Sequence, residues 1–124
     1  MLADKDSSAI VPVTDFAEAK RFYGETLGLD RGEEMDGIAT YRTGGTTLVL
    51  YESENAGTNR GNAVVWGVGE ELDAIVVELK SKGVEFLEYD FPDTTFHDGV
   101  HESHGTKMAW FKDPSGNILH INSM

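Results

Sequence analysis

Cysteine is absent from this chain of 124 residues, which excludes disulfide bonds, thiolate zinc sites, iron–sulfur clusters and cysteine nucleophiles. No apolar run approaches the roughly 20 residues that a membrane span requires, and the first residues form neither a basic region nor an apolar signal core. Basic residues are few, 10 against 22 acidic ones, so the net charge of −12 repels nucleic acid and anionic lipid. We therefore expect a cytoplasmic protein that binds neither membranes nor nucleic acid.

The composition that remains is typical of a single folded domain. Hydrophobic residues make up 40% and charged residues 26% of the chain, both close to the averages for globular proteins. The length suits one domain over residues 1–124. The acidity has two interpretations that composition alone leaves open: simple solubility, or attraction of a cationic small molecule, a hydrated metal or a basic partner.

The first half of the chain predicts a strand, a helix and three further strands. An apolar segment at residues 8–13 predicts the first strand, and Asp15 with Glu18 has the spacing of a capping box that begins a helix. Gly28 stands where a helix C-cap glycine belongs. Glycine-containing turns then separate three predicted strands, at residues 29–35, 38–43 and 46–51. These elements form a βαβββ module over about residues 8–52.

The same order of elements recurs over about residues 62–122, which form a second module. Adding 55 carries Gly28 to Gly83, and adding 71 carries Leu48 to Leu119. The predicted elements are a strand at 63–68, a helix from 72 to 83, and strands at 85–91, 106–112 and 118–122. The two offsets differ, which indicates an inserted loop at about residues 92–105 that we expect to close over a cavity. The predicted fold class is α+β with tandem βαβββ modules.

Three short patterns point to a known family. They are Ile10-Val11-Pro12-Val13 with Asp15, Phe22-Tyr23 ahead of Gly28, and Trp110-Phe111-Lys112-Asp113-Pro114-Ser115-Gly116-Asn117. Together with the repeat they resemble the vicinal oxygen chelate superfamily, which includes glyoxalase I, extradiol dioxygenases, fosfomycin-resistance enzymes and metal-free bleomycin-resistance proteins. The resemblance implies a cupped mixed sheet around a cavity and a homodimer that pairs the modules.

The resemblance also provides a test for a catalytic metal. Metal enzymes of the family take their ligands from the first and last strands of each module. The four matching positions are Ser8, Val49, Ala63 and His120. Only His120 can coordinate a metal, so we expect no cofactor and no catalytic residue. The alternative is a metal-dependent lyase, thiol transferase or dioxygenase whose single divalent metal is bound by His120 together with His101 and His104.

The expected activity is therefore the binding and sequestration of a small molecule, such as a cationic or aromatic antibiotic. Aromatic side chains stack on flat ligands and attract cations to their faces. The candidate ligand-binding residues are Trp110, Tyr51, Val49, His120, Tyr41, Trp66, His97 and His101. Strand alternation from Ala63 points Trp66 toward the helix instead, which weakens its place in this set. A third hypothesis is a regulatory or structural module whose cavity has no ligand.

Overall fold

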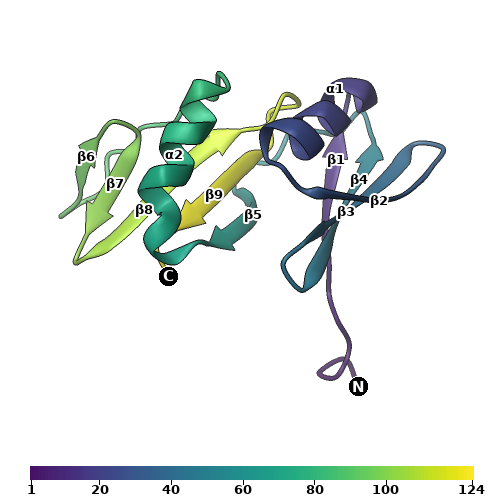
Figure 1. Ribbon diagram of the computed structural model, residues 1–124, viewed down its shortest axis with the longest axis horizontal. Coiled ribbons are helices and arrows are strands. Elements are labelled where there is room, and N and C mark those ends of the chain that lie inside the picture. The colour runs from purple at the N-terminus through teal and green to yellow at the C-terminus, as the bar shows by residue number, and fades with distance from the viewer.

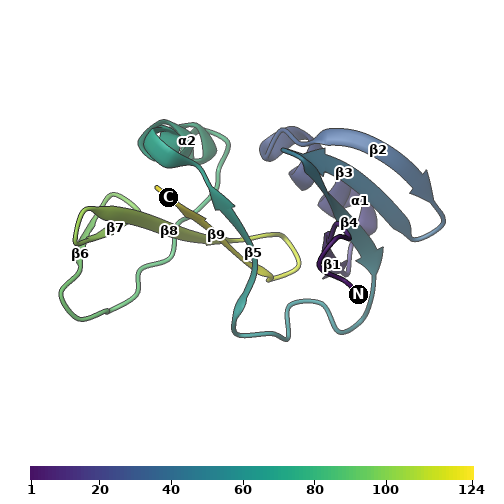
Figure 2. The ribbon, with the colours of Figure 1, turned by 90° about the horizontal axis from the view of Figure 1, so that it is seen from below.

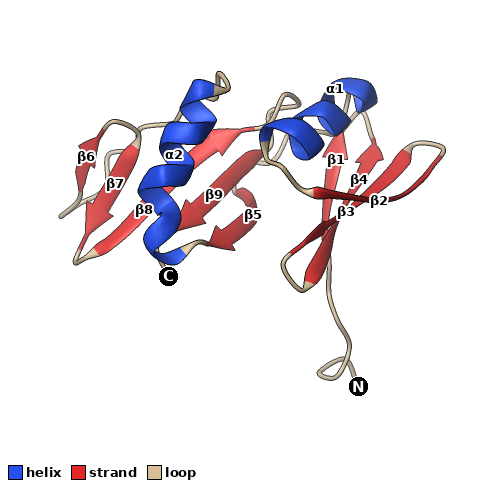
Figure 3. Cartoon of the chain, viewed as in Figure 1, coloured by secondary structure: helices blue, strands red, loops and turns tan.

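Two modules follow one another along the chain, with the element orders βαβββ and βαββββ, and each places its helices over one sheet (Figures 1 and 3). The computed structural model describes residues 1–124. The first module contains β1 (Ala9–Val13), α1 (Phe16–Arg21), the π-helix η1 (Phe22–Thr26), β2 (Asp30–Met35), β3 (Ile38–Thr43) and β4 (Thr46–Glu52). The second contains β5 (Asn62–Gly67), the 3₁₀-helix η2 (Gly69–Glu71), α2 (Leu72–Ser81), β6 (Thr95–His97), β7 (Val100–Ser103), β8 (Thr106–Lys112) and β9 (Ile118–Asn122). The expected α+β fold is confirmed.

Each module has its own mixed sheet. Sheet 1 has the strand order β1-β4-β3-β2, and sheet 2 has the order β5-β9-β8-β7-β6. The pairs β1–β4 and β5–β9 are parallel, and every other pair is antiparallel. Figure 2 shows α2 on one face of sheet 2, while no helix covers the opposite face. In each sheet, we call the face that lies away from the helix of its module the open face.

The core lies between the helices and the covered faces of the sheets, and it continues from one module into the other. Alternate residues of most strands enter it, as the period of two requires, for example Val11 and Val13 on β1 and Leu119 and Ile121 on β9, whereas β2 and β6 contribute none. The helix of the second module contributes Leu72, Val76 and Leu79. No helix of the structure combines the length and the apolar character needed to cross a bilayer.

The turn between β8 and β9 joins the modules. One oxygen of Asp113 (Oδ1) accepts hydrogen bonds from the backbone N–H groups of Ser115 and Asn117, each at 2.9 Å. The other oxygen accepts from the Tyr23 hydroxyl and from the Asn117 side-chain amide, each at 2.8 Å. The same amide donates to the Pro12 carbonyl at 2.7 Å. The most specific motif of the sequence is therefore a structural joint.

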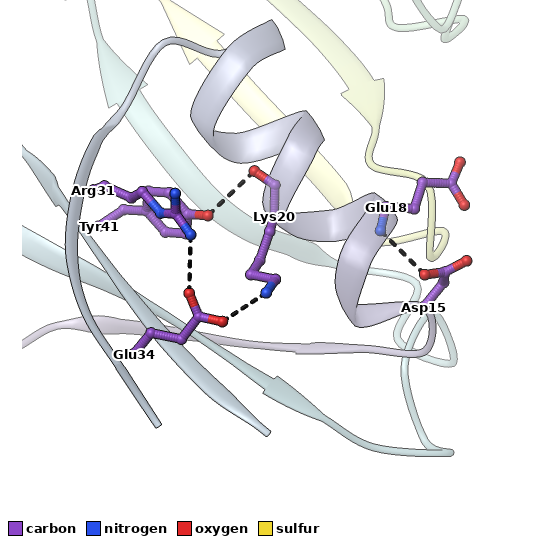
Figure 4. Close-up of polar contacts among 6 residues, drawn as sticks. All are labelled: Asp15, Glu18, Lys20, Arg31, Glu34 and Tyr41. Atoms are coloured by element: carbon purple, nitrogen blue, oxygen red, sulfur yellow. Dashed lines mark hydrogen bonds and ion pairs between the residues drawn. The ribbon is translucent and has the colours of Figure 1, made fainter. Parts of the chain in front are cut away.

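The helix of the first module begins and ends as its sequence indicates, with one difference. Asp15 caps α1 by accepting a hydrogen bond from the Glu18 N–H at 3.1 Å (Figure 4). After Arg21 the helix widens into the π-helix η1, where the Leu27 N–H donates to the Phe22 carbonyl. Gly28 then adopts a φ of +72°, which favours glycine.

The structure differs from the sequence interpretation at residues 85–105. Residues 92–105, expected as an inserted loop, include β6 and β7, and β7 occupies the position in sheet 2 that β2 occupies in sheet 1. Asp98 and Gly99, with φ values of +51° and +93°, form the tight turn between these strands. The expected strand at residues 85–91 is reduced to one bridge between Phe86 and Phe111.

Candidate functional site

The open face of each sheet carries apolar side chains that no helix covers. On sheet 1, Ile10 is 65% exposed and Met35 61%, and the half-buried Val49 and Tyr51 lie on the same face. On sheet 2, Val65 is 57% exposed and stands beside His120 in the strand register. Exposed apolar groups on two sheet faces are more typical of a binding or pairing surface than of a solvated exterior.

Six rings gather on the open face of sheet 2, and we call them the aromatic cluster. Its members are Tyr89, Phe91, Phe96, His101, Trp110 and His120. Trp110 lies at the centre and stacks on His120, with ring centroids 4.5 Å apart and an angle of 19° between planes. His101 meets Trp110 edge to face at 5.0 Å. The cross-strand pair Trp110–His120 places both rings on the same side of the sheet, opposite α2.

The segment of residues 87–91, which we call the strap, covers the cluster. At the start of the strap, the Leu87 N–H donates to the Trp110 carbonyl of β8 at 2.8 Å, and the chain then turns away from β8. The connection from α2 to β6 then passes on the side of the sheet away from α2 (Figure 2). The Tyr89 N–H donates to Nε2 of His101 at 2.9 Å, so a side chain replaces the backbone acceptor of a regular strand. The rings of Tyr89 and Phe91 lie 5.2 and 5.5 Å from Trp110, which is only 7% exposed.

His120 is held in its neutral form. Its Nδ1 lies 3.0 Å from the Ala109 carbonyl oxygen. Because a carbonyl oxygen can only accept a hydrogen bond, Nδ1 carries the proton and acts as the donor. Burial lowers the pKa of His120 below its usual 6.5, and the bond to Ala109 opposes this shift only in part. The neutral imidazole stacked on the indole makes the centre of the cluster flat and uncharged.

A dependence of stability on pH follows from this shift. Because the pKa of His120 is lower in the folded chain, the unfolded chain binds more protons as the pH falls through about 6.5. We expect the free energy of unfolding to decrease over this interval and His120→Gln to remove that part of the slope. Urea denaturation at a series of pH values measures it, with His97→Gln as the control because His97 is exposed. An equal slope in wild type and His120→Gln would contradict the assignment.

The residues present do not fit a metal centre. Of the four positions that the resemblance matches to metal ligands, Ser8, Val49 and Ala63 carry no imidazole or carboxylate, which leaves His120 alone. The alternative set does not converge either, because His101 is buried in the aromatic cluster and bonded to Tyr89, while His104 is exposed at a turn. Nowhere do three or more His, Asp or Glu side chains converge in a way that could hold a metal.

Two of the candidate residues lie on the covered faces. Tyr41 is 1% exposed and packs under α1, where its hydroxyl donates to the Lys20 carbonyl at 3.2 Å (Figure 4). Tyr41 is therefore a core residue and not a ligand-binding residue. Its partner in the strand register is Leu48, which is also buried. Around it, Glu34 accepts from Lys20 at 2.6 Å and from Arg31 at 3.1 Å, and these bonds lower the pKa of Glu34.

Trp66 also faces the helix side, as its alternation from Ala63 indicates. Its indole N–H donates to Oγ1 of Thr43 at 3.0 Å, across the gap between the modules. It lines a cavity of about 390 Å³ with Leu27, Ile75 and Phe111. This cavity lies away from the aromatic cluster.

The remaining candidates are divided between the two sheets. Val49 and Tyr51 lie on sheet 1, whereas Trp110, His120 and His101 lie together on sheet 2. His97 is exposed and pairs with Asp98 at 3.1 Å, outside the cluster. Sequence reasoning missed Tyr89, Phe91 and Phe96, although the spacing of Tyr89 and Phe91 along a predicted strand was a usable signal.

Acidic residues are absent from the strands on this side of sheet 2, and the strap carries two that are exposed, Glu88 and Asp90. No Asp or Glu occupies a strand position on the open face of sheet 2, where Lys112 is the charged residue. Glu102 takes the opposite face, paired in the register with Lys107, whose ammonium group contacts Asp73 of α2. The net charge of −12 therefore acts at long range and not through contacts within the cluster.

Comparisons with known proteins agree with this architecture. Residues 7–121 match the profile of the glyoxalase/bleomycin resistance protein/dioxygenase superfamily, and no curated protein matches the sequence significantly. Among solved structures, TnmS3, an antibiotic binding protein from Streptomyces sp. CB03234, is 26% identical over 98% of this chain and 97% of its own, with a TM-score of 0.70. A glyoxalase/bleomycin resistance protein from the same organism is 26% identical over 94% and 99%, with a TM-score of 0.67. Lactoylglutathione lyase from Agrobacterium tumefaciens is 15% identical over 96% and 92%, with a TM-score of 0.70, which is a likeness of fold.

Proposed function

Because the chain belongs to the glyoxalase/bleomycin resistance protein/dioxygenase superfamily and its residues do not fit the metal site of the enzymes, we propose that it binds and sequesters a small aromatic molecule without chemistry. The observation that carries the proposal is the aromatic cluster on the open face of sheet 2. Of its rings, Phe91 and Phe96 are 41% and 37% exposed and present flat apolar surface to a flat ligand, while Trp110 is covered by the strap. The 26% identical TnmS3 is an antibiotic binding protein, which adds support.

An aromatic ligand fits this face better than a strongly cationic one. The strands around Trp110 supply no carboxylate on the open face, and the acidic residues of the strap, Glu88 and Asp90, are exposed to solvent, where salt screens their charge. The acidic residues elsewhere on the surface would steer a cation in solution, with an effect that salt screens.

The binding test uses the fluorescence of Trp110. In a Trp66→Phe variant, Trp110 is the one remaining tryptophan. Titration with a panel of planar aromatic compounds should change its emission with a saturable, one-site dependence. The matched control is Trp110→Phe, in which all tryptophan emission comes from Trp66. Because Trp66 lies on the covered face, this emission should stay constant during the titration. If no compound perturbs Trp110 at millimolar concentration, the proposed function is refuted.

The metal-dependent lyase, thiol transferase or dioxygenase is tested separately. We expect purified protein to contain no stoichiometric transition metal, and a chelator to leave its melting temperature unchanged. One zinc, nickel or iron ion per chain, lost together with stability in His120→Gln, would support the enzyme instead.

We further propose that two copies pair through their open faces, because apolar side chains are exposed on both. Ile10 and Val65 are 65% and 57% exposed, and burying such groups is the main driving force of association. A closed pair of this kind is the commonest arrangement of soluble oligomers. The binding site would then include Val49 and Tyr51 from sheet 1.

We expect the protein to sediment as a dimer at micromolar concentration. A charge placed in the paired faces by Val65→Asp or Ile10→Asp should shift it to a monomer, because an unpaired carboxylate is costly to bury. Val77→Asp is the matched control, since Val77 is 68% exposed on α2, away from both open faces. A wild-type monomer, or a dimer that Val77→Asp disrupts and Val65→Asp leaves intact, would exclude this interface.

A further inference from the structure

We propose that Nδ1–H of His101 is the hydrogen-bond donor of the binding site, and that the ligand is a planar aromatic molecule with an acceptor atom in or on its ring. This inference rests on the proposed function and names the ligand class for the same site.

The protonation state of His101 follows from its contacts. Its side chain is 0% exposed, and Nε2 accepts a hydrogen bond from the Tyr89 N–H at 2.9 Å. An imidazole nitrogen that accepts cannot carry a proton, so in the neutral ring the proton is on Nδ1. The backbone of the strap therefore fixes the tautomer and directs the free N–H to the other side of the ring.

That N–H has no partner in the protein. It is the one buried side-chain nitrogen or oxygen of the structure without a hydrogen bond. Native proteins satisfy nearly all such groups, and an exception calls for a specific explanation. The explanation we give is that the donor is complementary to a ligand, since an unpaired donor gains most from an acceptor brought to it in an apolar surrounding.

The surroundings of His101 define the shape of that ligand. Four rings flank the imidazole, with centroids 4.8 Å away for Phe96, 5.0 Å for Trp110, 6.0 Å for Phe91 and 6.1 Å for Tyr89. Phe91 and Phe96 are 41% and 37% exposed, so they can turn outward and admit a planar ring in their place. The admitted ring then packs against Trp110 and brings its acceptor to Nδ1.

The decisive experiment compares isoquinoline with naphthalene, two ligands of one shape that differ by a ring nitrogen in place of a C–H. The measured quantity is the ratio of their dissociation constants, in wild type and in His101→Phe, which keeps a ring and loses both nitrogens. We expect the preference for isoquinoline to fall about tenfold in His101→Phe, as for one lost hydrogen bond to a buried donor. His101→Gln, which can both accept from Tyr89 and donate, should retain most of the preference.

Phe96→Leu is the matched control, because it alters the shape of the site and leaves the donor in place. It should change both affinities together and leave the ratio near that of wild type. If naphthalene and isoquinoline bind wild type and the ratio is the same in His101→Phe, the donor assignment is overturned and the aromatic site stands. If wild type binds neither compound in Trp110 fluorescence, and the wider panel also leaves Trp110 unchanged, the proposed function itself fails.

A second measurement covers the case in which His101→Phe does not fold. The imidazole nitrogens of ¹⁵N-histidine-labelled wild type report the tautomer directly by NMR. We expect a protonated Nδ1 and an unprotonated Nε2, and a shift of the Nδ1 signal with isoquinoline that naphthalene does not produce. A proton on Nε2, or equal shifts with both compounds, would refute the inference.

Discussion

Replacing Trp110 with alanine should lower the free energy of unfolding by about 3 to 5 kcal/mol. The indole is 7% exposed and contacts four rings, those of Tyr89, Phe91, His101 and His120. Removing it leaves a cavity under the strap that these side chains can fill only in part. Urea denaturation followed by far-UV circular dichroism measures the loss.

Trp110→Phe keeps an aromatic ring in the cluster and should lose much less. Val77→Ala, on the exposed side of α2, should change stability by less than about 0.5 kcal/mol. If Trp110→Ala unfolded with the same midpoint as wild type, the strap would not pack against the indole in solution. Trp110 is thus a structural centre of the site as well as a surface for ligand.

Asp113→Ala should be similarly destabilising, with a loss of about 3 to 5 kcal/mol. The carboxylate is 4% exposed and accepts four hydrogen bonds, from Tyr23, Ser115 and Asn117. Its removal leaves those donors buried without an acceptor. Thermal and urea unfolding of the variant give the size of the effect.

A double-mutant cycle with Tyr23→Phe isolates the bond between the modules. Burial and the nearby carboxylate of Asp113 raise the pKa of Tyr23 far above its usual 10, so the hydroxyl remains a donor. We expect Tyr23→Phe to cost about 1 to 3 kcal/mol in wild type and clearly less in Asp113→Ala. Additive losses would show that the two side chains are not coupled.

The repeat and the open face of sheet 2 could be predicted from the sequence because both depend on simple periodicity. The turn from Asp113 to Gly116 fixes the register of β8 and β9, which sets Trp110 beside His120. The same alternation places Trp66 on the covered face. The same alternation, applied to β3, would have predicted a core position for Tyr41, opposite Leu48, in place of a position in the binding site.

The strap could not be predicted, because it depends on a contact between segments that no local pattern encodes. Tyr89 leaves the sheet when its N–H bonds to the side chain of His101 and not to a neighbouring strand. The hairpin that follows did have a local signal, since Asp98-Gly99 is a typical two-residue hairpin turn, but it lay in a segment interpreted as an insertion. Val49 and Tyr51 lie on the other sheet, so their distance from the cluster depends on how the two modules pack. Sequence periodicity carries no information about that packing.

The joint at Asp113 also sets an order of events during folding. Its bonds reach across most of the chain: Tyr23 and Asp113 are 90 residues apart, and Pro12 and Asn117 are 105 apart. When the first module leaves the ribosome, Asp113 has not yet been synthesised, so the Tyr23 hydroxyl lacks its hydrogen-bond acceptor. Closing so long a loop also costs chain entropy before the contact forms. The hydrogen bonds that link the first module to this turn can therefore form only after residues 113–117, close to the last strand, have been synthesised.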